Sequence, residues 1–277
     1  MNIPLIQNPL KEMLAPLGIL QSGQMIGFPA NDRIGLIYIL GRIGQGKSEM
    51  LTTFAINDIL QGRGGIFIDP FGDINAEIMK HIPADKRSSV KKFEVKKGDA
   101  KSNIAKFKKE IHLNEFAKKP GLFLLCSLHY PLIGAFEARE TGLYILKEYL
   151  KALKSKGLIN HSVFIDEAHN FLNKEILADL LKSRKQGFSV IFSDQNIDAY
   201  SSDMMDLIFN ATDNLICYNI EKRTARFAAH KIGIAIQPEY LESVEKYHFW
   251  ASLKINGKRE PAIKACGVFP IPYPKTK

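Results

Sequence analysis

The most constraining feature of this 277-residue sequence is a glycine-rich segment that follows an almost wholly apolar run. The run is Ile34–Leu40, and the segment Gly41–Ser48 reads G-R-I-G-Q-G-K-S, which fits the pattern G-x-x-x-x-G-K-[ST]. Glycines let backbone N–H groups surround phosphate oxygens, and the first turn of a following helix adds the positive end of its dipole. A helical pattern does follow, so the segment predicts a site for the phosphates of a nucleotide.

Two side chains of this segment have specific predicted roles. In a loop of this kind the lysine, here Lys47, reaches the β- and γ-phosphates, and the Ser48 hydroxyl is a ligand of Mg²⁺. We therefore predict ATP and Mg²⁺ as cofactors, with Lys47 acting in both binding and catalysis. The predicted nucleotide contacts are Gly41, Gly44, Gln45, Gly46, Lys47, Ser48 and Glu49.

A pair of acids at the end of a second apolar run supplies the groups that hydrolysis requires. Asp166 and Glu167 directly follow the run Ser162–Ile165. A strand that ends there places Asp166 beside Mg²⁺, and Glu167 can then polarise the attacking water. The second acid favours hydrolysis over nucleotide binding alone.

The residues Asp166–His169 also spell the DEAH box of superfamily 2 helicases. Those enzymes need a second RecA-like domain, and the sequence after His169 is too short to supply one. We therefore predict that His169 is a helix-start or surface histidine with no helicase role.

Apolar runs rich in β-branched residues alternate with amphipathic stretches along the chain. Hydrophobic strands separated by helices predict an α/β fold with a mostly parallel central sheet and helices on both faces. The predicted strands are Ile34–Leu40, Gly65–Ile68, Gly121–Leu128, Ser162–Ile165, Ser189–Phe192 and Asn214–Ile220. The predicted helices are Lys47–Gln61, Ile74–Ile82, Lys101–Lys119, Glu137–Lys156, Lys174–Gln186, Asp203–Asn210 and Arg223–Ile232.

The two ends of the chain differ from this alternating core. Residues 1–30 contain four prolines and are predicted to be an irregular N-terminal arm. Residues 31–246 form the predicted core. Residues 247–277 are predicted to be a C-terminal β-hairpin with a proline-rich tail, because Asn256-Gly257 supplies a tight turn between two runs of strand character.

The basic charge is concentrated in one segment. The whole chain has a formal net charge of +9, and Lys86–Lys119 contains 12 Lys and Arg against 4 Asp and Glu. A local excess of this size predicts a polyanionic partner, either nucleic acid or an acidic membrane surface. The alternative is a solvated, lysine-rich helical face.

Composition excludes several classes of protein. With 45% hydrophobic and 24% charged residues, the chain is neither disordered nor a coiled coil. No apolar run is long enough to span a membrane, and the N-terminus lacks the pattern of a secretory signal. Three cysteines far apart, Cys126, Cys217 and Cys266, predict buried thiols in a reducing compartment, with neither zinc nor disulfides.

Three further segments together resemble the HerA/FtsK superfamily of P-loop ATPases. Residues 68–73 read I-D-P-F-G-D, residues 181–187 read L-K-S-R-K-Q-G, and residues 193–195 read S-D-Q. They resemble the D-P-H-G-D, R-K-x-G and glutamine-ended strand elements of that superfamily, with Phe71 in place of the usual histidine. Their order matches conjugative coupling-type proteins and viral genome-packaging ATPases over residues 34–220.

The resemblance implies a RecA-like P-loop NTPase and further site residues. Arg184 is then the arginine finger that acts on ATP held by a neighbouring subunit, and Gln195 is the γ-phosphate sensor. From the residues alone, Arg184 could instead complement a helix dipole, and Gln195 could cap a turn. Weaker candidates for a second arginine are Arg223 and Arg226, and Asp69 and Asp73 are acids of unassigned role.

The sequence also departs from full-length coupling proteins. Those carry N-terminal transmembrane helices and an all-helical insertion, and the interval between Asp73 and Asp166 is too short for that insertion. The chain therefore resembles a minimal motor domain, closer in size to the packaging ATPases.

The leading functional hypothesis is an ATP-hydrolysing nucleic-acid translocase. By resemblance it is a homo-oligomeric ring, a hexamer, that packages a viral genome or transfers DNA in conjugation. DNA of unspecified strandedness is then held mainly through its phosphates, a capsid or membrane-portal protein is a further partner, and the location is the cytoplasm or a virion.

Two alternatives remain open at this level. An assembly or secretion ATPase would move protein or act at a membrane surface with the same phosphate chemistry. A nucleotide-binding regulator or small-molecule kinase is disfavoured by Glu167 and by the lack of an evident lid.

Overall fold

The computed structural model describes residues 4–6, 14–29, 31–154, 160–195, 197–233 and 235–268. Its strands form an eleven-stranded, mostly parallel sheet in the order β2-β1-β13-β10-β9-β3-β8-β7-β4-β6-β5, and a two-stranded sheet, β11-β12. The chain divides into two compact units. Unit 1 is Met1–Phe54 with Ile191–Ile271, and unit 2 is Ala55–Val190 with Pro272–Lys277.

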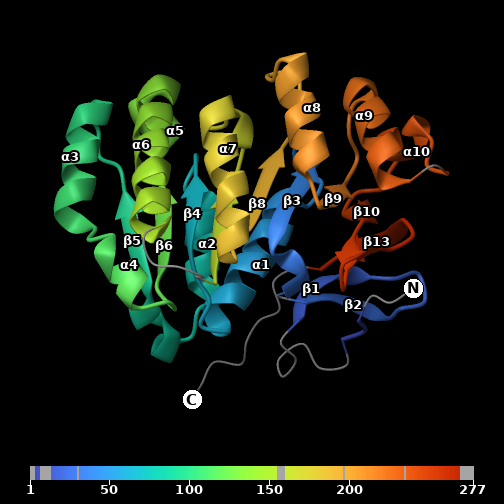
Figure 1. The fold of residues 1–277 in the computed structure, drawn as a ribbon, viewed down its shortest axis with the longest axis horizontal. Coiled ribbons are helices and arrows are strands. Elements are labelled where there is room, and N and C mark those ends of the chain that lie inside the picture. Colours follow the sequence, from blue (N-terminus) through green and yellow to red (C-terminus); the bar gives the residue numbers. More distant parts are fainter. Residues whose placement is uncertain are drawn as a thin grey trace. The chain divides into compact units, whose positions relative to one another are not determined.

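Unit 1 is organised around β3, which is buried at every position and pairs in parallel with β9. Antiparallel partners then follow in the order β10, β13, β1 and β2. Helix α9 packs against β9 and β10, and α10 packs against α9 (Figure 1). The strands of this unit are β1 (Leu14–Ile19), β2 (Met25–Pro29), β3 (Gly35–Leu40), β9 (Asn214–Cys217), β10 (His248–Ser252), β11 (Lys254–Ile255), β12 (Lys258–Arg259) and β13 (Ile263–Gly267). Its helices are η1 (Asn31–Arg33), α8 (Ser202–Ala211), α9 (Lys222–Ile232) and α10 (Pro238–Glu242).

Unit 2 holds four parallel strands, of which β4, β6 and β7 are buried at every residue. Such burial requires cover on both faces of each strand. The strands are β4 (Gly64–Asp69), β5 (Val90–Glu94), β6 (Phe123–Ser127) and β7 (His161–Ile165). The helices are α2 (Asp73–His81), η2 (Ala84–Ser89), α3 (Ala100–Glu110), α4 (Asn114–Lys118), α5 (Tyr130–Ile133), α6 (Ala135–Lys154), η3 (Ala168–Asn170), α7 (Lys174–Ser183) and η4 (Arg184–Gln186). Two elements, α1 (Lys47–Leu60) and β8 (Ser189–Asp194), have residues in both units.

The predicted α/β fold is confirmed, but the N-terminal region is more regular than expected. Leu14–Ile19 and Met25–Pro29 are strands of the large sheet, where the prolines had suggested an irregular arm. The central apolar side chains of the two strands are buried, namely Ala15, Leu17, Ile26 and Phe28, and the pairing is irregular between Pro16 and Gly18. Proline is tolerated at such an irregularity and at the end of an edge strand, so it did not exclude strands here.

The predicted C-terminal hairpin is confirmed, and its strands belong to the main sheet. Lys254 pairs with Arg259 and Ile255 with Lys258, and the turn residues Asn256 and Gly257 both have positive φ. Asn-Gly favours that backbone geometry. Because β10 also pairs with β9, and β13 with β1, the hairpin is part of the sheet of unit 1. Residues 269–277 lie outside the described residues, and the boundaries at 30 and 246 stay a prediction.

The basic segment holds a strand that the sequence did not reveal. Val90–Glu94 is the edge strand β5, and only Phe93 in it is buried. Lys91 and Lys92 are exposed there, and lysine on an edge strand discourages pairing with other chains. The single predicted helix Lys101–Lys119 is two helices, α3 and α4, because Ile111 is extended. No helix of the described residues is long and apolar enough to cross a membrane.

One buried histidine of unit 2 makes stability depend on pH. His161 is fully buried and its Nδ1 lies 2.8 Å from the Tyr149 hydroxyl. Burial, with a smaller contribution from the charge of Arg63, lowers the pKa of His161 from 6.5 to about 4. The unfolded chain therefore binds a proton at a higher pH than the folded protein, and stability falls as pH decreases from about 6.5 to about 4.

We predict that this histidine accounts for a loss of about 3 kcal/mol in the free energy of unfolding over that interval. Urea unfolding of the wild type and of His161→Gln at several pH values measures it, and the variant should show a flatter dependence. His112→Gln, at an exposed position, is the matched control and should keep the wild-type slope. If the free energy of unfolding depended on pH equally in His161→Gln and in the wild type, His161 would not be the source of the pH dependence.

Candidate nucleotide-binding site

The glycine-rich segment lies in unit 1, between the end of β3 at Leu40 and the start of α1 at Lys47. Gly44 has φ +69° and Gly46 has φ +121°, conformations that favour glycine. A Cβ on Gly46 would also come within 2.9 Å of the Tyr218 ring. The φ of Gly46 and the close approach of Tyr218 therefore favour glycine there, as the sequence pattern predicted, and the φ of Gly44 favours glycine at a position that the pattern leaves variable.

Successive N–H groups of this loop have no acceptor in the described part of the protein. They belong to Ile43, Gly44, Gln45 and Gly46. Gly46 is buried, and Gln45 Oε1 is buried without a hydrogen-bond partner among the described residues. Unpaired N–H groups before the first turn of a helix are the donors that bind phosphate oxygens. The loop thus fits the triphosphate of a nucleotide.

The lysine of the loop is held close to the same backbone. Lys47 is only 6% exposed, and its Nζ donates to the carbonyls of Gly41 at 2.7 Å and Arg42 at 3.2 Å. Ser48 is exposed and Glu49 is half-buried in the first turn of α1. The side chain that is predicted to bind phosphate is therefore folded over the loop, with the predicted metal ligand beside it in sequence.

Two tyrosines support the loop, and no sequence pattern pointed to either of them. A Cβ on Gly41 would lie 2.8 Å from Tyr218 Cβ, so Tyr218 lies against two glycines of the loop. The N–H of Tyr247 donates to Gln45 O at 3.2 Å, and Tyr247 has φ +66°, which is rare for a bulky residue. Because Tyr247 begins the C-terminal hairpin, the hairpin fixes the position of the loop backbone.

The end of β8 also lies beside the loop. Gly41 N donates to Asp194 O at 3.2 Å, and the buried Asp194 carboxylate accepts from the hydroxyls of Tyr38 and Tyr200, each at 2.8 Å. Gln195, the predicted sensor, directly follows and is half-buried. Unit 1 therefore brings Gln195 and the glycine-rich loop to neighbouring strand ends.

The two predicted acids follow β7 in unit 2, and both are buried. Asp166 is 5% and Glu167 is 6% exposed. The N–H of Asp166 donates to Ile68 O of β4 at 3.1 Å, and Glu167 has φ +46°, an uncommon conformation outside glycine. The Glu167 carbonyl accepts from the side chain of Asn170 at 3.0 Å. The backbone therefore holds both carboxylates in a defined place at the end of the strand.

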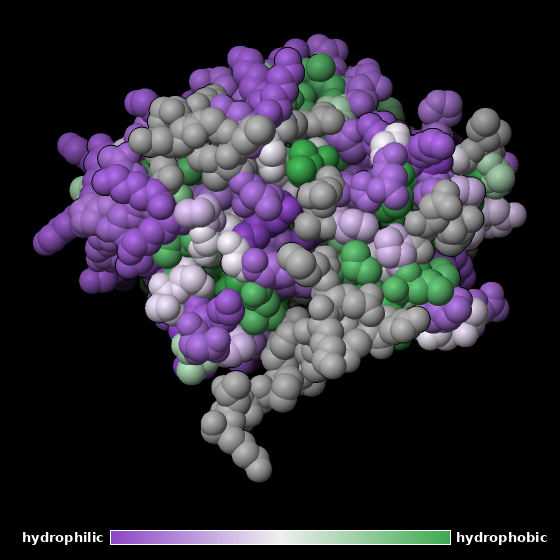
Figure 2. All heavy atoms as spheres, turned by 60° about the horizontal axis from the view of Figure 1, so that its bottom comes forward, coloured by the Kyte–Doolittle hydropathy of each residue, from purple (hydrophilic) through white to green (hydrophobic). Residues whose placement is uncertain are grey.

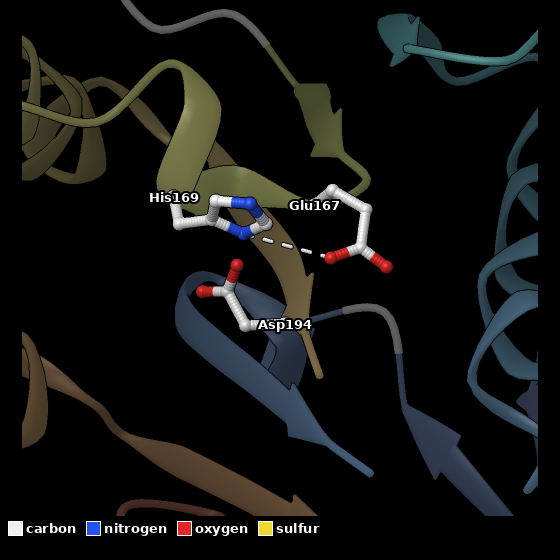
Figure 3. Close-up of side chains that lie close together, drawn as sticks. All are labelled: Glu167, His169 and Asp194. Atoms are coloured by element: carbon white, nitrogen blue, oxygen red, sulfur yellow. Dashed lines mark ion pairs between the residues drawn. The ribbon is translucent and has the colours of Figure 1, made fainter. Parts of the chain in front are cut away.

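His169 is at the start of a short 3-10 helix, as predicted, but it also contacts the candidate base. Its Nδ1 lies 3.5 Å from Glu167 Oε2, and the two side chains point toward one another (Figure 3). The His169 side chain is 30% exposed. When protonated it forms an ion pair with Glu167, a contact that the sequence did not indicate. Asp194, also drawn in Figure 3, belongs to unit 1.

Tyr130 is a further residue near these acids. Its hydroxyl is buried, with no hydrogen-bond partner in the described part of the chain. Burial raises the pKa of Tyr130, the charge of Arg139 lowers it, and the charges of Glu167 and Asp166 raise it further. A buried hydroxyl that lies within the field of both carboxylates can donate to one of them or to a bound ligand.

Asp69 of the D-P-F-G-D segment has a structural role. Its carboxylate accepts from the backbone N–H groups of Phe71, Gly72 and Asn75 at 3.0, 2.8 and 2.9 Å. Burial is the main influence on the pKa of Asp69 and raises it. Three bonds to its own turn shape the end of β4, whereas Asp73 is exposed at the start of α2.

The candidate arginines lie on η4 and α9. Arg184 begins η4 after α7, and its side chain lies outside the described part of the structure. Arg223 is exposed on α9 and its NH1 lies 2.7 Å from Asp198 Oδ1, while Arg226 is exposed. The roles of the three arginines stay predictions.

The fold and the loop together define an α/β protein with a RecA-like P-loop architecture. A comparison with family models finds no match, and neither does one with curated protein sequences. Solved structures do match. The bacterial conjugative coupling protein TrwBdeltaN70 has a TM-score of 0.70 and 12% identity, over 93% of this chain and 89% of that chain.

A second similar structure is the genome-packaging NTPase B204 of Sulfolobus turreted icosahedral virus 2, solved with ATP-gammaS. It has a TM-score of 0.52 and 16% identity, over 84% of this chain and 98% of that chain. TrwB in complex with the non-hydrolysable ATP analogue ADPNP has a TM-score of 0.65 and 11% identity, over 91% of this chain and 89% of that chain. Both types of protein that the sequence resembles therefore share its fold.

Proposed function

We propose that this chain is an ATP-hydrolysing motor that moves DNA and works as a homo-oligomeric ring. The observation that carries the proposal is the glycine-rich loop, in which four successive N–H groups have no acceptor among the described residues and Lys47 is buried. Support comes from the fold, which is shared with a coupling protein of conjugation and with a genome-packaging NTPase. Binding, positioning and hydrolysis of ATP are the chemistry for which such a loop is suited.

The proposed roles follow the residue types and their places. The triphosphate is bound by Gly41, Gly44, Gln45, Gly46, Lys47, Ser48 and Glu49. Ser48 with Asp166 would hold Mg²⁺, which when bound neutralises charge on the phosphates. Glu167 accepts a proton from the attacking water, and Gln195 reports the state of the γ-phosphate. Arg184 acts on ATP held by a neighbouring copy.

The biological setting has two branches, genome packaging and conjugative DNA transfer. In both settings the proposed assembly is a hexameric ring with a capsid or membrane-portal protein as partner, and its location is the cytoplasm or a virion. Neighbouring capsid genes would support the first branch, and neighbouring relaxase genes would support the second.

The basic segment provides the proposed contact with DNA phosphates. Lys91, Lys92, Lys96 and Lys97 are exposed on β5 and the loop that follows it. Hydrophilic side chains gather over this part of unit 2 in Figure 2. Lys106 is different, because its Nζ bonds to Glu94 O at 2.6 Å and Glu110 Oε2 at 3.0 Å. The proposed DNA surface therefore comprises the four exposed lysines and excludes Lys106.

ATPase activity measured with and without DNA at low salt tests this proposal, and we expect stimulation by DNA. Changing the four lysines to Gln should weaken DNA binding and reduce the slope of log affinity against log salt by about 0.9 for each phosphate that the variant no longer neutralises. Basal hydrolysis should not change. A matched control replaces four exposed lysines of the hairpin region, Lys246, Lys254, Lys258 and Lys264.

No stimulation by any DNA would contradict the motor function. An unchanged salt slope in the Lys91/Lys92/Lys96/Lys97 variant would favour the alternative, in which these lysines form a solvated surface that does not contact DNA. Binding to anionic vesicles in place of DNA would support the assembly or secretion ATPase.

A further inference from the structure

A hollow on unit 2 is a candidate docking site that the nucleotide chemistry does not use. It has a volume of about 390 Å³ and lies between α3, α4 and α6. Its floor is apolar, and the Phe107 and Tyr144 rings meet edge to face with centroids 6.5 Å apart. Ile111, which is buried, and Leu113 complete the floor. A cavity of this size accommodates a large side chain of a partner.

The rim of this hollow is mainly basic. Lys108 Nζ lies 5.1 Å from the centroid of the Tyr144 ring, and Lys151, with a side chain 80% exposed, is 3.8 Å from Glu148. Both lysines are exposed, so the ion pair of Lys151 is worth little to folding. The hollow therefore combines an aromatic floor with exposed ammonium groups, which suits an acidic segment with an aromatic anchor.

A segment of unit 1 has the complementary character. Tyr240 on α10 is 54% exposed, so its ring is available to a partner. Residues 237–245 read Q-P-E-Y-L-E-S-V-E, with three glutamates and no lysine or arginine. Glu239 and Glu245 are exposed on either side of Tyr240. An exposed aromatic side chain is thus flanked in sequence by two exposed glutamates, and the exposed Lys246 follows them.

We propose that Tyr240 of one copy of this chain inserts into the hollow between α3, α4 and α6 of a second copy. Glu239 and Glu245 then face the lysine rim, and the Tyr240 ring covers the apolar floor. A buried aromatic anchor within a polar, charge-complementary rim is the usual composition of an energetically important contact.

The form of the hollow favours protein over nucleic acid as the occupant. Contact with a DNA backbone uses exposed cations and hydroxyls, and it gains nothing from an apolar floor or from the carboxylate of Glu148. The segment and the hollow are different surfaces, so the contact is heterologous and generates a ring when its rotation closes. The inference rests on the oligomeric part of the proposed function and names the contact that would form it.

Charge reversal of each surface in the full chain tests the contact. Mass photometry and sedimentation in ATP-gammaS without DNA should show oligomers of the wild type. Glu239→Lys/Glu245→Lys and Lys108→Glu/Lys151→Glu should each lower the association constant at least tenfold. Mixing the two variants should restore assembly, because each then meets an opposite charge. Tyr240→Ala should also weaken assembly, and mixing it with either charge-reversed variant should not restore assembly.

The control variant is Lys254→Glu/Lys258→Glu, which makes the same change of net charge as Lys108→Glu/Lys151→Glu on exposed residues outside the hollow and should assemble like the wild type. Thermal unfolding verifies that each variant is folded. Monomeric wild type, normal assembly of the reversed variants, or failure of the mixture to assemble would each overturn the proposal. Because assembly is measured without turnover or DNA, loss of assembly is distinguishable from failure of the ATPase function.

Discussion

Replacing Glu167 by Gln should lower kcat for ATP hydrolysis by about 10²–10⁴-fold while ATP still binds. The carboxylate is proposed to accept a proton from the attacking water, and a positioned general base contributes a factor of that size. Glutamine has nearly the same shape and cannot accept the proton. The side chain is buried after β7 and its backbone is fixed in a left-handed conformation, so the substitution should leave the strand end in place.

Steady-state hydrolysis together with fluorescent ATP binding measures this effect. His169→Gln is the matched control, because it removes the ion pair with Glu167 and keeps the carboxylate. It should reduce kcat much less than Glu167→Gln does. Hydrolysis by Glu167→Gln at the wild-type rate would exclude Glu167 as the base and would favour the nucleotide-binding regulator.

Replacing Lys47 by Ala should have an effect of similar size, but on binding as well as on rate. A hydrogen bond to a charged group is worth about 1.5–3 kcal/mol, which corresponds to roughly a 10- to 150-fold loss of ATP affinity. Loss of the positive charge where negative charge develops should reduce kcat by a further factor of about 10²–10³. The two variants therefore differ in a measurable way, because only Lys47→Ala weakens ATP binding.

Arg42→Ala is the control for the loop, since Arg42 is exposed and occupies a variable position of the motif. We expect ATP binding close to that of the wild type. Because Lys47 Nζ also bonds to the Gly41 and Arg42 carbonyls, thermal unfolding of Lys47→Ala is measured in parallel. Unchanged ATP affinity in folded Lys47→Ala would contradict the assignment of this loop as the phosphate site.

The parts of the site that the sequence predicted are those encoded locally. Gly46, a fixed glycine of the motif, adopts a backbone conformation that favours glycine, so the sequence pattern follows directly from the geometry of the loop. The same holds for Asn256-Gly257, whose backbone preference predicted the hairpin. Asp166 and Glu167 could be predicted because they directly follow an apolar run that is typical of a buried strand.

Other features depend on contacts between distant segments and carried no local signal. Tyr218 lies against Gly41 and Gly46, and the N–H of Tyr247 holds the Gln45 carbonyl, although both tyrosines come some 170–200 residues after the loop. Strand β5 was missed because an edge strand buries few residues, and its lysines resemble those of a surface helix. The prolines of the first 30 residues led to the prediction of an irregular arm. That prediction was wrong for β1 and β2, because edge strands and irregular pairing accommodate proline.

ATP-driven movement along DNA is the most direct test of the central claim. A duplex carrying a bound third strand, and a single strand with a streptavidin block, are incubated with the protein and ATP. The motor proposal predicts that the wild type displaces at least one of these blocks only when ATP can be hydrolysed, and that Glu167→Gln displaces neither. Displacement of neither block by a wild-type protein that hydrolyses ATP and binds DNA would contradict the proposal that this chain moves DNA.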